Sequence, residues 1–320
     1  MVTKDGKEMR DMIKVSAPAT IANLGPGYDL MGMALDRPSD ILEVEFSQDG
    51  EDAITVTGVG SETISNALNN ASLVAGRAVL KKTGNEEVKL SMRLNKGVPP
   101  RMGMGSSGAS SAAGAFAVNE LLGRPLEPEA LLICAMEGER ASCGAAHADN
   151  VAPALFGGVV VITDYSPIRV CRLNVIEGAE IVVVSPELEM AQEKTKLARE
   201  VLPREVPLSK LIAQMSAFAS LIAGITNKDL KLLGSGISRD VIIEPARSVL
   251  IPGFKDVKEA ALSNGAYGCS ISGAGPSIFA IAPEGEGVRI GKAMKDAFGS
   301  HGVKAAFSTH ECNKEGARVV

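Results

Sequence analysis

The sequence is organised around the stretch Pro99-Pro100-Arg101-Met102-Gly103-Met104-Gly105-Ser106-Ser107-Gly108, which runs directly into Ala109-Ser110-Ser111-Ala112-Ala113-Gly114-Ala115. The prolines and glycines of the first part are typical of a turn, and the apolar residues of the second part recur at helical spacing. That spacing continues to Leu121, and Gly123 is a typical stop signal. The stretch therefore predicts a glycine-rich loop that leads directly into a helix.

The start of this helix is suited to binding an anion. Ser106 or Ser107 can cap the helix, because a seryl oxygen accepts a hydrogen bond from a free N–H group of the first turn. The remaining free N–H groups and the positive end of the helix dipole face the loop. Glycine lets the backbone approach phosphate oxygens closely, and the serine hydroxyls can reach a phosphate or its magnesium ion. We therefore predict a phosphate-binding loop.

Two other interpretations of the glycine pattern stay open. Gly103-x-Gly105-x-x-Gly108 also fits the dinucleotide-binding pattern of nicotinamide enzymes, although Lys96–Pro100 separates it from the apparent strand Val88–Leu94. A helix start that binds no ligand is the simplest alternative. The lysine-containing phosphate loop and the protein-kinase signatures V-A-I-K, H-R-D and D-F-G are absent from the sequence.

The composition disfavours several classes of protein. With 320 residues, the chain is long enough for two domains. Its net charge of −5, with Lys and Arg scattered, disfavours nucleic acid or an anionic membrane as a partner. Met1–Asp11 lacks a secretion signal, and we expect no apolar run of about 18 residues that would span a bilayer. The five cysteines lack metal-binding spacing, which favours reduced thiols in the cytoplasm.

Helical and strand patterns mix without a regular βαβ order, which favours an α+β fold over a doubly wound sheet. The pattern changes around Asp164–Pro167, so we expect an N-terminal domain over residues 1–165 and a C-terminal domain over residues 166–320. Ile41–Phe46 and Ala53–Thr57 are expected to form two strands joined by a turn at Asp49-Gly50. We interpret Gly144–Pro153 as a tight connection.

Three glycine-bearing segments lie in different thirds of the chain, where they would let the backbone approach a phosphorylated ligand from several sides. In order, they are Pro18–Asp29, Pro99–Ala113 and Ser272–Ser277. They resemble the three motifs of the GHMP kinase superfamily, which is named after galactokinase, homoserine kinase, mevalonate kinase and phosphomevalonate kinase. The resemblance covers nearly the whole chain after Ile13.

Within the superfamily, the chain is most similar to the homoserine kinases. The similarity rests on Ala22–Asp29, His147–Ala154, Glu244–Arg247 and Leu250–Gly253. It implies an N-terminal domain like the second domain of ribosomal protein S5 and a ferredoxin-like C-terminal domain. It also implies magnesium-assisted transfer of the γ-phosphoryl group of ATP to the side-chain hydroxyl of L-homoserine, on the route to threonine. A homodimer stays open as the assembly of the chain.

The resemblance assigns the nucleotide phosphates to the backbone amides of the glycine-rich loop. It implies that Mg²⁺ is held by the hydroxyl of Ser107, or of Ser106, and by the carboxylate of Glu139. The residues expected to contact the nucleotide are Pro99, Arg101, Gly103, Met104, Gly105, Ser106, Ser107, Gly108, Gly273 and Gly275, with Asn70 and Lys96 at the adenosine end and Ser272 as an extra donor.

The loop departs from the family pattern at three positions. Arg101 stands where the family usually has glycine, and Met104 and Gly108 replace leucine and alanine. The Arg101 guanidinium could add a phosphate contact or point to solvent. Arg101 is also the main feature that favours an alternative function, a regulatory protein that binds a nucleotide without transferring phosphate.

The acceptor is a zwitterion, so its site needs an anion for the ammonium group and cations for the carboxylate. The resemblance places the following residues at this site: Asn23, Asp29, His147, Asn150, Thr195, Arg199 and Arg247. Asp29 with Asn23 suits the ammonium group, and the two arginines suit bidentate binding of the carboxylate. A kinase for another small alcohol, such as mevalonate or shikimate, is an alternative. Asn150 together with the two arginines and the aspartate disfavours an uncharged polyol as acceptor.

Many members of the superfamily have an aspartate as general base where this chain has Asn150, whose amide cannot take a proton. We expect Asn150 to orient the hydroxyl, since phosphoryl transfer depends mostly on positioning and charge stabilisation. Asp149 is an alternative base. We expect His147 to order the loop by hydrogen bonding rather than to carry a proton.

Overall fold

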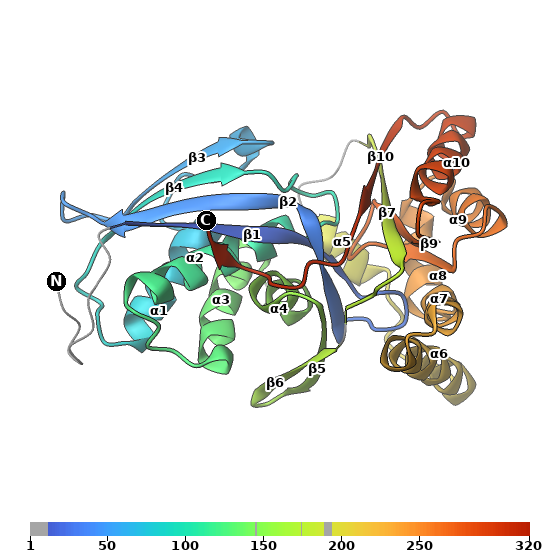
Figure 1. Ribbon diagram of the computed structural model, residues 1–320, viewed down its shortest axis with the longest axis horizontal. Helices are drawn as coiled ribbons and strands as arrows, with labels where there is room; N and C mark the ends of the chain where they lie inside the picture. The colour runs from blue at the N-terminus through green and yellow to red at the C-terminus, as the bar shows by residue number, and fades with distance from the viewer. Residues whose placement is uncertain (1–11, 145, 174, 189–193) are drawn as a thin grey trace.

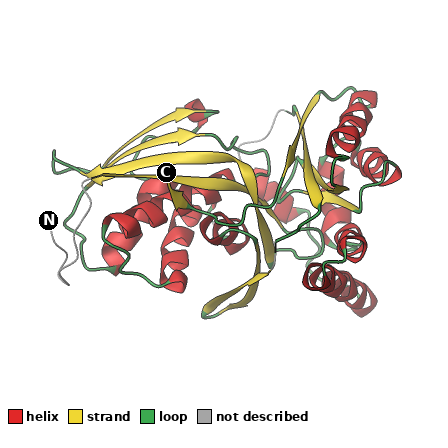
Figure 2. Cartoon of the chain, in the orientation of Figure 1, coloured by secondary structure: helices red, strands yellow, loops and turns green. Residues whose placement is uncertain are grey.

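The computed structural model describes residues 12–144, 146–173, 175–188 and 194–320. Two sheets lie next to each other, and each is covered by helices (Figure 1). Helices and strands alternate irregularly along the chain, as expected of an α+β fold. Figure 2 shows the helices packed beside the strands of the two sheets.

The larger sheet is built on two long antiparallel strands. β1 (Met12–Ala22) pairs with β2 (Met31–Phe46) from its first residue to its last. The other strands of this sheet are β11 (Arg318–Val319) beside β1, β4 (Leu90–Lys96) beside β2, β3 (Ala53–Gly58) at the edge, and β5 (Val159–Tyr165) with β6 (Ile168–Leu173) at the far end of β2.

The predicted hairpin between Ile41–Phe46 and Ala53–Thr57 is wrong. β4 lies between β2 and β3, and β3 runs parallel to β4. β4 buries Leu90, Met92 and Leu94 on one face and therefore suits an interior position. β3 has most of its residues exposed, which suits the edge of the sheet.

Four helices cover one face of the larger sheet (Figure 1). They are α1 (Ala71–Lys82), α2 (Ser106–Leu121), α3 (Pro128–Cys143) and α4 (Ala148–Phe156), and a short turn, η1 (Ser61–Thr63), precedes them. α2 is the central helix and is buried almost all round. Its small residues permit this packing: a Cβ on Gly114 would lie 2.0 Å from the carbonyl oxygen of Ser72 in α1.

α4 replaces the tight connection that the sequence predicted over Gly144–Pro153. His147 is the residue before the helix, and Pro153 lies inside it. The proline leaves the carbonyl oxygen of Asp149 without its usual helical donor. Gly32 of β2 packs directly against this oxygen, since a Cβ there would lie only 1.7 Å away. The tertiary packing against β2 therefore accommodates a helix that its proline and glycine signals disfavour.

The smaller sheet is antiparallel throughout. In spatial order its strands are β10 (Ala305–His310), β7 (Ala179–Pro186), β9 (Ile278–Pro283) and β8 (Gly268–Ile271). The helices of this half are α5 (Lys194–Glu200), α6 (Leu208–Asn227), α7 (Leu230–Ser238), α8 (Ile243–Arg247), α9 (Phe254–Ser263) and α10 (Gly287–Ser300), with the turn η2 (Ser248–Leu250) after α8.

One apolar core joins the two sheets. It contains Met33 of β2, Phe279 of β9 and Leu221 of α6, all of which are fully buried. A second core lies between the larger sheet and its helices, and a third lies between the smaller sheet and α9 and α10. The shared core fixes the walls of the cleft where the two halves meet.

The two sheets do not divide at residue 165. β5 and β6 pair with each other across that point, with Asp164 opposite Arg169. β7 is the first strand of the smaller sheet, and the chain returns at its end to pair β11 with β1. We therefore propose that the domain boundary lies between β6 and β7, and that the last residues belong with the N-terminal half.

α6 contains no unbroken run of 18 apolar residues, as expected, but it is the one candidate membrane span among the described residues. By length and composition alone it could cross a membrane, with a mean hydropathy of 1.5. A single helix of this kind is only weak evidence for a membrane span, because core helices of globular proteins can have the same length and hydropathy. Leu221 and Ile225 of α6 pack in the core shared by the two sheets.

A buried ion pair fixes the strand that leads into the glycine-rich loop. Lys96 Nζ contacts Asp40 Oδ2, and the two side chains are 1% and 0% exposed. Asp40 Oδ1 also accepts a hydrogen bond from the backbone N–H of Val98, at 3.0 Å. Lys96 Nζ donates to the carbonyl oxygen of Ser106 at 3.1 Å and to Ser110 Oγ at 2.8 Å. The pair therefore ties the end of β4 and the start of α2 to β2.

We expect Lys96→Met to lower the free energy of unfolding by about 3–5 kcal/mol, because the Asp40 carboxylate would stay buried without its cation. Urea unfolding followed by circular dichroism measures the change. The control is Lys14→Met, which breaks the solvent-exposed pair with Glu43 and should cost no more than about 1 kcal/mol. Equal, small losses in the two variants would contradict the structural role of the buried pair.

Candidate functional site

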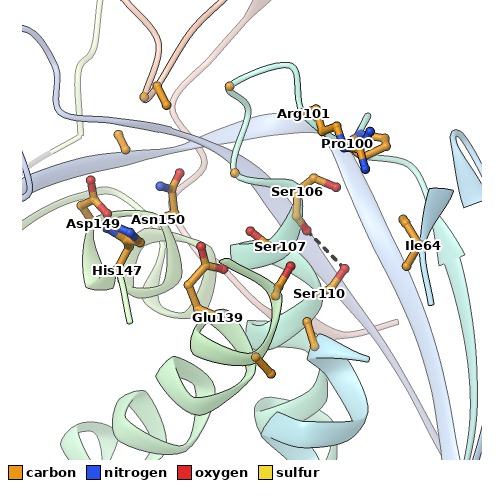
Figure 3. Close-up of a pocket in the computed structure, with 18 of the residues that line it drawn as sticks. Ile64, Pro100, Arg101, Ser106, Ser107, Ser110, Glu139, His147, Asp149 and Asn150 are labelled. Atoms are coloured by element: carbon orange, nitrogen blue, oxygen red, sulfur yellow. Dashed lines mark hydrogen bonds between the residues drawn. The ribbon is translucent and has the colours of Figure 1, made fainter. Parts of the chain in front are cut away.

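A cavity of about 570 Å³ lies where the glycine-rich loop, α3 and α4 face α5, α8 and the turn at Gly273. Figure 3 shows part of its lining. Most of the predicted site residues line it: Asn23, Asp29, Asn70, Lys96, Arg101, Gly103, Gly105, Ser106, Ser107, Glu139, His147, Asn150, Arg199, Arg247 and Gly273. The structure therefore brings the predicted phosphate site and the predicted acceptor site into one space.

Five predicted residues whose side chains the structure describes do not line the cavity. Met104, Gly108, Ser272 and Gly275 are buried, and Pro99 is half-buried at the start of the loop. Thr195 belongs to α5, but its side chain lies outside the described residues.

The loop passes so close to its neighbours that only glycine fits at two positions. Gly103 and Gly105 have φ values of 79° and 65°, in the left-handed region. A Cβ on Gly103 would lie 2.5 Å from the carbonyl oxygen of Ser272, and one on Gly105 would lie 1.9 Å from Thr20 Oγ1. The hydroxyl of Ser272 donates to the carbonyl oxygen of Gly103 at 2.6 Å, so this hydroxyl holds the loop.

The predicted capping of α2 by Ser106 or Ser107 is wrong. Gly105 is the residue before the helix, and no side chain caps the first turn. Ser106 Oγ donates instead to the carbonyl oxygen of Val98, at 2.9 Å. The first turn of α2 lines the cavity through Ser106 and Ser107, and the positive end of the helix dipole lies there, which suits it to bind an anion. Arg101 is exposed before the loop, with a φ of 63°.

Glu139 of α3 faces the first turn of α2, where Ser107 lies (Figure 3). Its side chain is buried, with 3% of the residue exposed. A carboxylate and a hydroxyl are oxygen ligands of the kind that Mg²⁺ prefers. Among the residues that the structure describes, no cluster of three or more His, Cys, Asp or Glu side chains forms a closed metal site. This donor set fits Mg²⁺, which commonly takes its other ligands from phosphates and water.

Asn70 and Lys96, predicted at the adenosine end, both interact with the protein itself. Asn70 Oδ1 accepts a hydrogen bond from the backbone of Ser72 at 2.9 Å and caps α1, while its Nδ2 donates to the carbonyl oxygen of Ser65 at 2.7 Å. Lys96 is held by the ion pair with Asp40. Their positions in the cavity wall suit a role in shaping the wall better than a direct contact with adenosine.

Asp29 is the centre of a charged cluster on the acceptor side. Its Oδ2 lies 3.6 Å from Arg199 Nη2, and its Oδ1 lies 3.7 Å from His147 Nδ1. Burial raises the pKa of Asp29, but His147 and the two arginines outweigh this and keep the pKa below its usual range. The contact with the Asp29 carboxylate raises the pKa of His147, against the effect of burial, and His147 Nδ1 also lies 3.2 Å from Arg199 Nη2. The backbone N–H of Asp29 donates to Asn23 Oδ1 at 3.0 Å.

Arg247 is held on three sides. Its Nε donates to the carbonyl oxygen of Ala198 at 3.0 Å, its Nη1 donates to that of Gly273 at 3.1 Å, and its guanidinium lies 4.8 Å from the ring centre of Tyr28. Asn23 Nδ2 also donates to the Gly273 oxygen, at 3.0 Å. The planar guanidinium is therefore fixed before a ligand arrives, which suits it to bind a carboxylate.

The sequence analysis missed Thr20, which positions Asn150. Thr20 is fully buried in β1, and its Oγ1 donates to Asn150 Oδ1 at 2.9 Å. The backbone N–H of Thr20 donates to the carbonyl oxygen of Met104, at 3.0 Å. Because Asn150 Oδ1 is occupied, its Nδ2 is the group left to meet a ligand. The only signal in the sequence was a single hydroxyl in the otherwise apolar stretch Ala17–Ala22.

Asp149 is the other carboxylate of the acceptor side. Only 3% of it is exposed, and its Oδ1 is buried with no hydrogen-bond partner. Burial, and then the nearby charge of Asp29, raise the pKa of Asp149 to about 7. In Figure 3 its side chain lies beside those of Asn150 and His147.

Comparison with known proteins decides the family. Residues 70–158 match the family model described as GHMP kinases N terminal domain, and residues 221–300 match that of GHMP kinases C terminal. The homoserine kinase of Pyrococcus abyssi is 40% identical over 295 residues, which are 92% of this chain and 95% of that protein. The chain belongs to the homoserine kinase family. The family member from Arabidopsis thaliana is 42% identical over 316 residues, with 96% of this chain and 84% of that protein covered.

The fold agrees with this assignment. The crystal structure of homoserine kinase from Cytophaga hutchinsonii has a TM-score of 0.90 at 40% identity and covers 98% of this chain and 99% of that one. The predicted two-domain GHMP kinase fold of mixed helices and sheets is therefore confirmed. The finer descriptions of the two halves, like ribosomal protein S5 and like ferredoxin, stay predictions.

We expect Gly105→Ala to weaken nucleotide binding. The left-handed backbone costs a non-glycine residue about 1–2 kcal/mol, which corresponds to roughly 5- to 30-fold in affinity, and the contacts with Thr20 and Asn150 add to it. Calorimetric titration with ADP measures the effect. The control is Gly299→Ala in α10, where a Cβ meets nothing within 4 Å. Wild-type affinity in the Gly105 variant would rule out this loop as the phosphate site.

Proposed function

We propose that this chain transfers the γ-phosphoryl group of ATP to the side-chain hydroxyl of L-homoserine, and so forms O-phospho-L-homoserine and ADP on the route to threonine. One observation carries the proposal: a single cavity joins an uncapped helix start, suited to phosphates, to a pocket with two guanidinium groups and two carboxylates. The relatives that bear the name homoserine kinase support the choice of acceptor. We place the activity in the cytoplasm, with no nucleic acid or membrane as partner, and leave a homodimer open.

The phosphates of ATP would lie against the amide groups of Gly103–Gly108 and the first turn of α2. Ser107 and Glu139 would hold Mg²⁺, which neutralises charge on the phosphates when it is bound. Gly273 lies across the cavity from the loop, and Ser272 keeps the loop and this turn together. These residues supply positioning and positive potential, which are the main requirements of phosphoryl transfer.

The acceptor would lie on the other side of the same cavity. Arg199 and Arg247 would bind its carboxylate, and Asn150 Nδ2 would hold its hydroxyl in line with the phosphate. The hydroxyl oxygen then forms a bond to the γ-phosphorus while the bond from that phosphorus to the bridging oxygen breaks, and ADP leaves. Because an amide cannot take a proton, the hydroxyl proton passes to an oxygen of the transferred group or to water.

An acceptor panel with Mg-ATP tests the proposal. The acceptors are L-homoserine, mevalonate and shikimate, and the measurement is acceptor-dependent release of ADP. We expect the highest kcat/KM with homoserine, because only its carboxylate and ammonium groups together match the charges of the pocket. Equal or better turnover of mevalonate or shikimate would overturn the choice of acceptor. Nucleotide binding without any acceptor-dependent release would favour a regulatory protein.

We expect Arg247→Ala to raise the KM for homoserine. Loss of a hydrogen bond to a charged group costs about 1.5–3 kcal/mol, or roughly 10- to 150-fold. Arg247→Lys should give a KM between those of the wild type and Arg247→Ala, since lysine keeps the positive charge but lacks the planar guanidinium. The control is Arg289→Ala, which removes an exposed arginine of α10. An unchanged KM in a folded Arg247 variant would remove this residue from the acceptor site.

A further inference from the structure

Glu244 belongs to the same short stretch as Arg247, but it does not line the cavity. Its side chain is buried, and both of its carboxylate oxygens have partners within the protein. Lys258 Nζ of α9 donates to Oε1, and Ser270 Oγ of β8 donates to Oε2 at 2.7 Å. A buried carboxylate that is paired in this way is part of the packing of the protein. The role of Glu244 therefore depends on which segments it joins.

The helix that carries Arg247 needs such external contacts. α8 has only five residues, and a helix this short is not stable by itself. Its start is fixed by Asp240, whose carboxylate accepts hydrogen bonds from the backbone N–H groups of residues 242, 243 and 244, at 2.9–3.1 Å. The side chain of Glu244 adds a second attachment, one turn before Arg247.

Glu244 joins the two chain segments that meet at the Arg247 guanidinium. Arg247 Nη1 donates to the carbonyl oxygen of Gly273 at 3.1 Å. Glu244 lies three residues before Arg247, and its partner Ser270 lies three residues before Gly273. The hydrogen bond between Ser270 and Glu244 therefore holds α8 against β8 just before the two segments reach the contact between Arg247 and Gly273.

Lys258 supplies the counter-charge and extends the attachment to two more helices. Its Nζ also donates to the carbonyl oxygen of Ser238, the last residue of α7, at 2.9 Å. The side chains of Lys258 and Glu244 are 15% and 10% exposed. Loss of one partner of a largely buried pair leaves the other charge without compensation. The pair therefore fixes α8 relative to α7 and α9 more firmly than a surface ion pair would.

We propose that Glu244 is a positioning residue for the acceptor carboxylate, because it holds α8 and the turn at Gly273 at the separation that keeps Arg247 in its binding orientation. Without Glu244, the contacts of Arg247 with the Ala198 oxygen and the Tyr28 ring keep the guanidinium in the cavity. Its plane is then less well fixed, and bidentate binding of a carboxylate depends on that plane. The inference rests on the proposed function, which supplies the carboxylate.

A double-mutant cycle between Glu244 and Arg247 tests the inference. We expect Glu244→Ala to raise the KM for L-homoserine roughly 5- to 30-fold, but less than about 2-fold when Arg247 is already alanine. The kcat should change little, since the carboxylate is bound alike before and during transfer. Glu244→Gln should give an intermediate KM, because its amide can still bond to Ser270. An unchanged KM in Glu244→Ala, or equal increases with and without Arg247, would overturn the inference.

A second measurement uses 3-aminopropanol, which is homoserine without its carboxylate. Its inhibition constant against homoserine should be the same in Glu244→Ala and the wild type, because it offers Arg247 nothing to bind. Equal weakening of both compounds would overturn the inference and make Glu244 a general support of the cavity.

The matched control is Glu180→Ala. Glu180 Oε2 accepts a hydrogen bond from the backbone N–H of Gly287, at the start of α10, at 2.7 Å. Its loss weakens the attachment of another helix in the same half of the molecule, so the unfolding temperature should fall while the homoserine KM stays at its wild-type value. A KM increase as large as that of Glu244→Ala would overturn the inference.

Two further measures keep the outcome clear. If Glu244→Ala does not fold, Ser270→Ala takes its place in the cycle, since it removes only the hydrogen bond to β8. Calorimetric titration of homoserine into the wild type and the variants follows the same cycle without turnover. Absence of turnover in the wild type would therefore overturn the proposed function, while the titrations decide the role of Glu244.

Discussion

The close backbone approach at the start of α2 is the constraint on which the rest of the site depends. Gly103 and Gly105 pass between β1 and the turn at Gly273 at distances that leave no space for a side chain. The buried pair of Lys96 and Asp40 anchors the strand that enters this passage. Because these contacts come from both halves of the molecule, the amide groups of the first turn hold one fixed orientation. A preorganised set of donors of this kind needs no rearrangement when charge moves along a phosphate.

The acceptor side follows a second principle, in which charges hold one another in place before the substrate binds. Arg247 is fixed by two backbone oxygens and a ring, and Arg199 by Asp29. Gly273 accepts hydrogen bonds from Asn23 and Arg247 together, so the turn that faces the phosphate loop also supports the acceptor pocket. The two ends of the cavity are therefore connected through the backbone of a single residue.

Local patterns predicted what depends on local structure. The loop and the helix after it followed from glycine and alanine spacing, and the three motifs indicated which segments meet at the site. The position of β3, the helix α4 and the partner of Ser106 Oγ escaped prediction because tertiary contacts decide each of them. Thr20 escaped for the same reason, since its partner Asn150 is 130 residues away in the chain. Asp149 was predicted only as an alternative base, because the sequence does not show that its side chain is buried.

A crystal structure with homoserine and a non-hydrolysable analogue of Mg-ATP tests the central claim most directly. The account predicts β- and γ-phosphate density against the amide groups of Gly103–Gly108 and the first turn of α2. It also predicts that the γ-phosphate faces the acceptor hydroxyl beside Asn150. Phosphate density anywhere else, with this loop empty, would contradict the account.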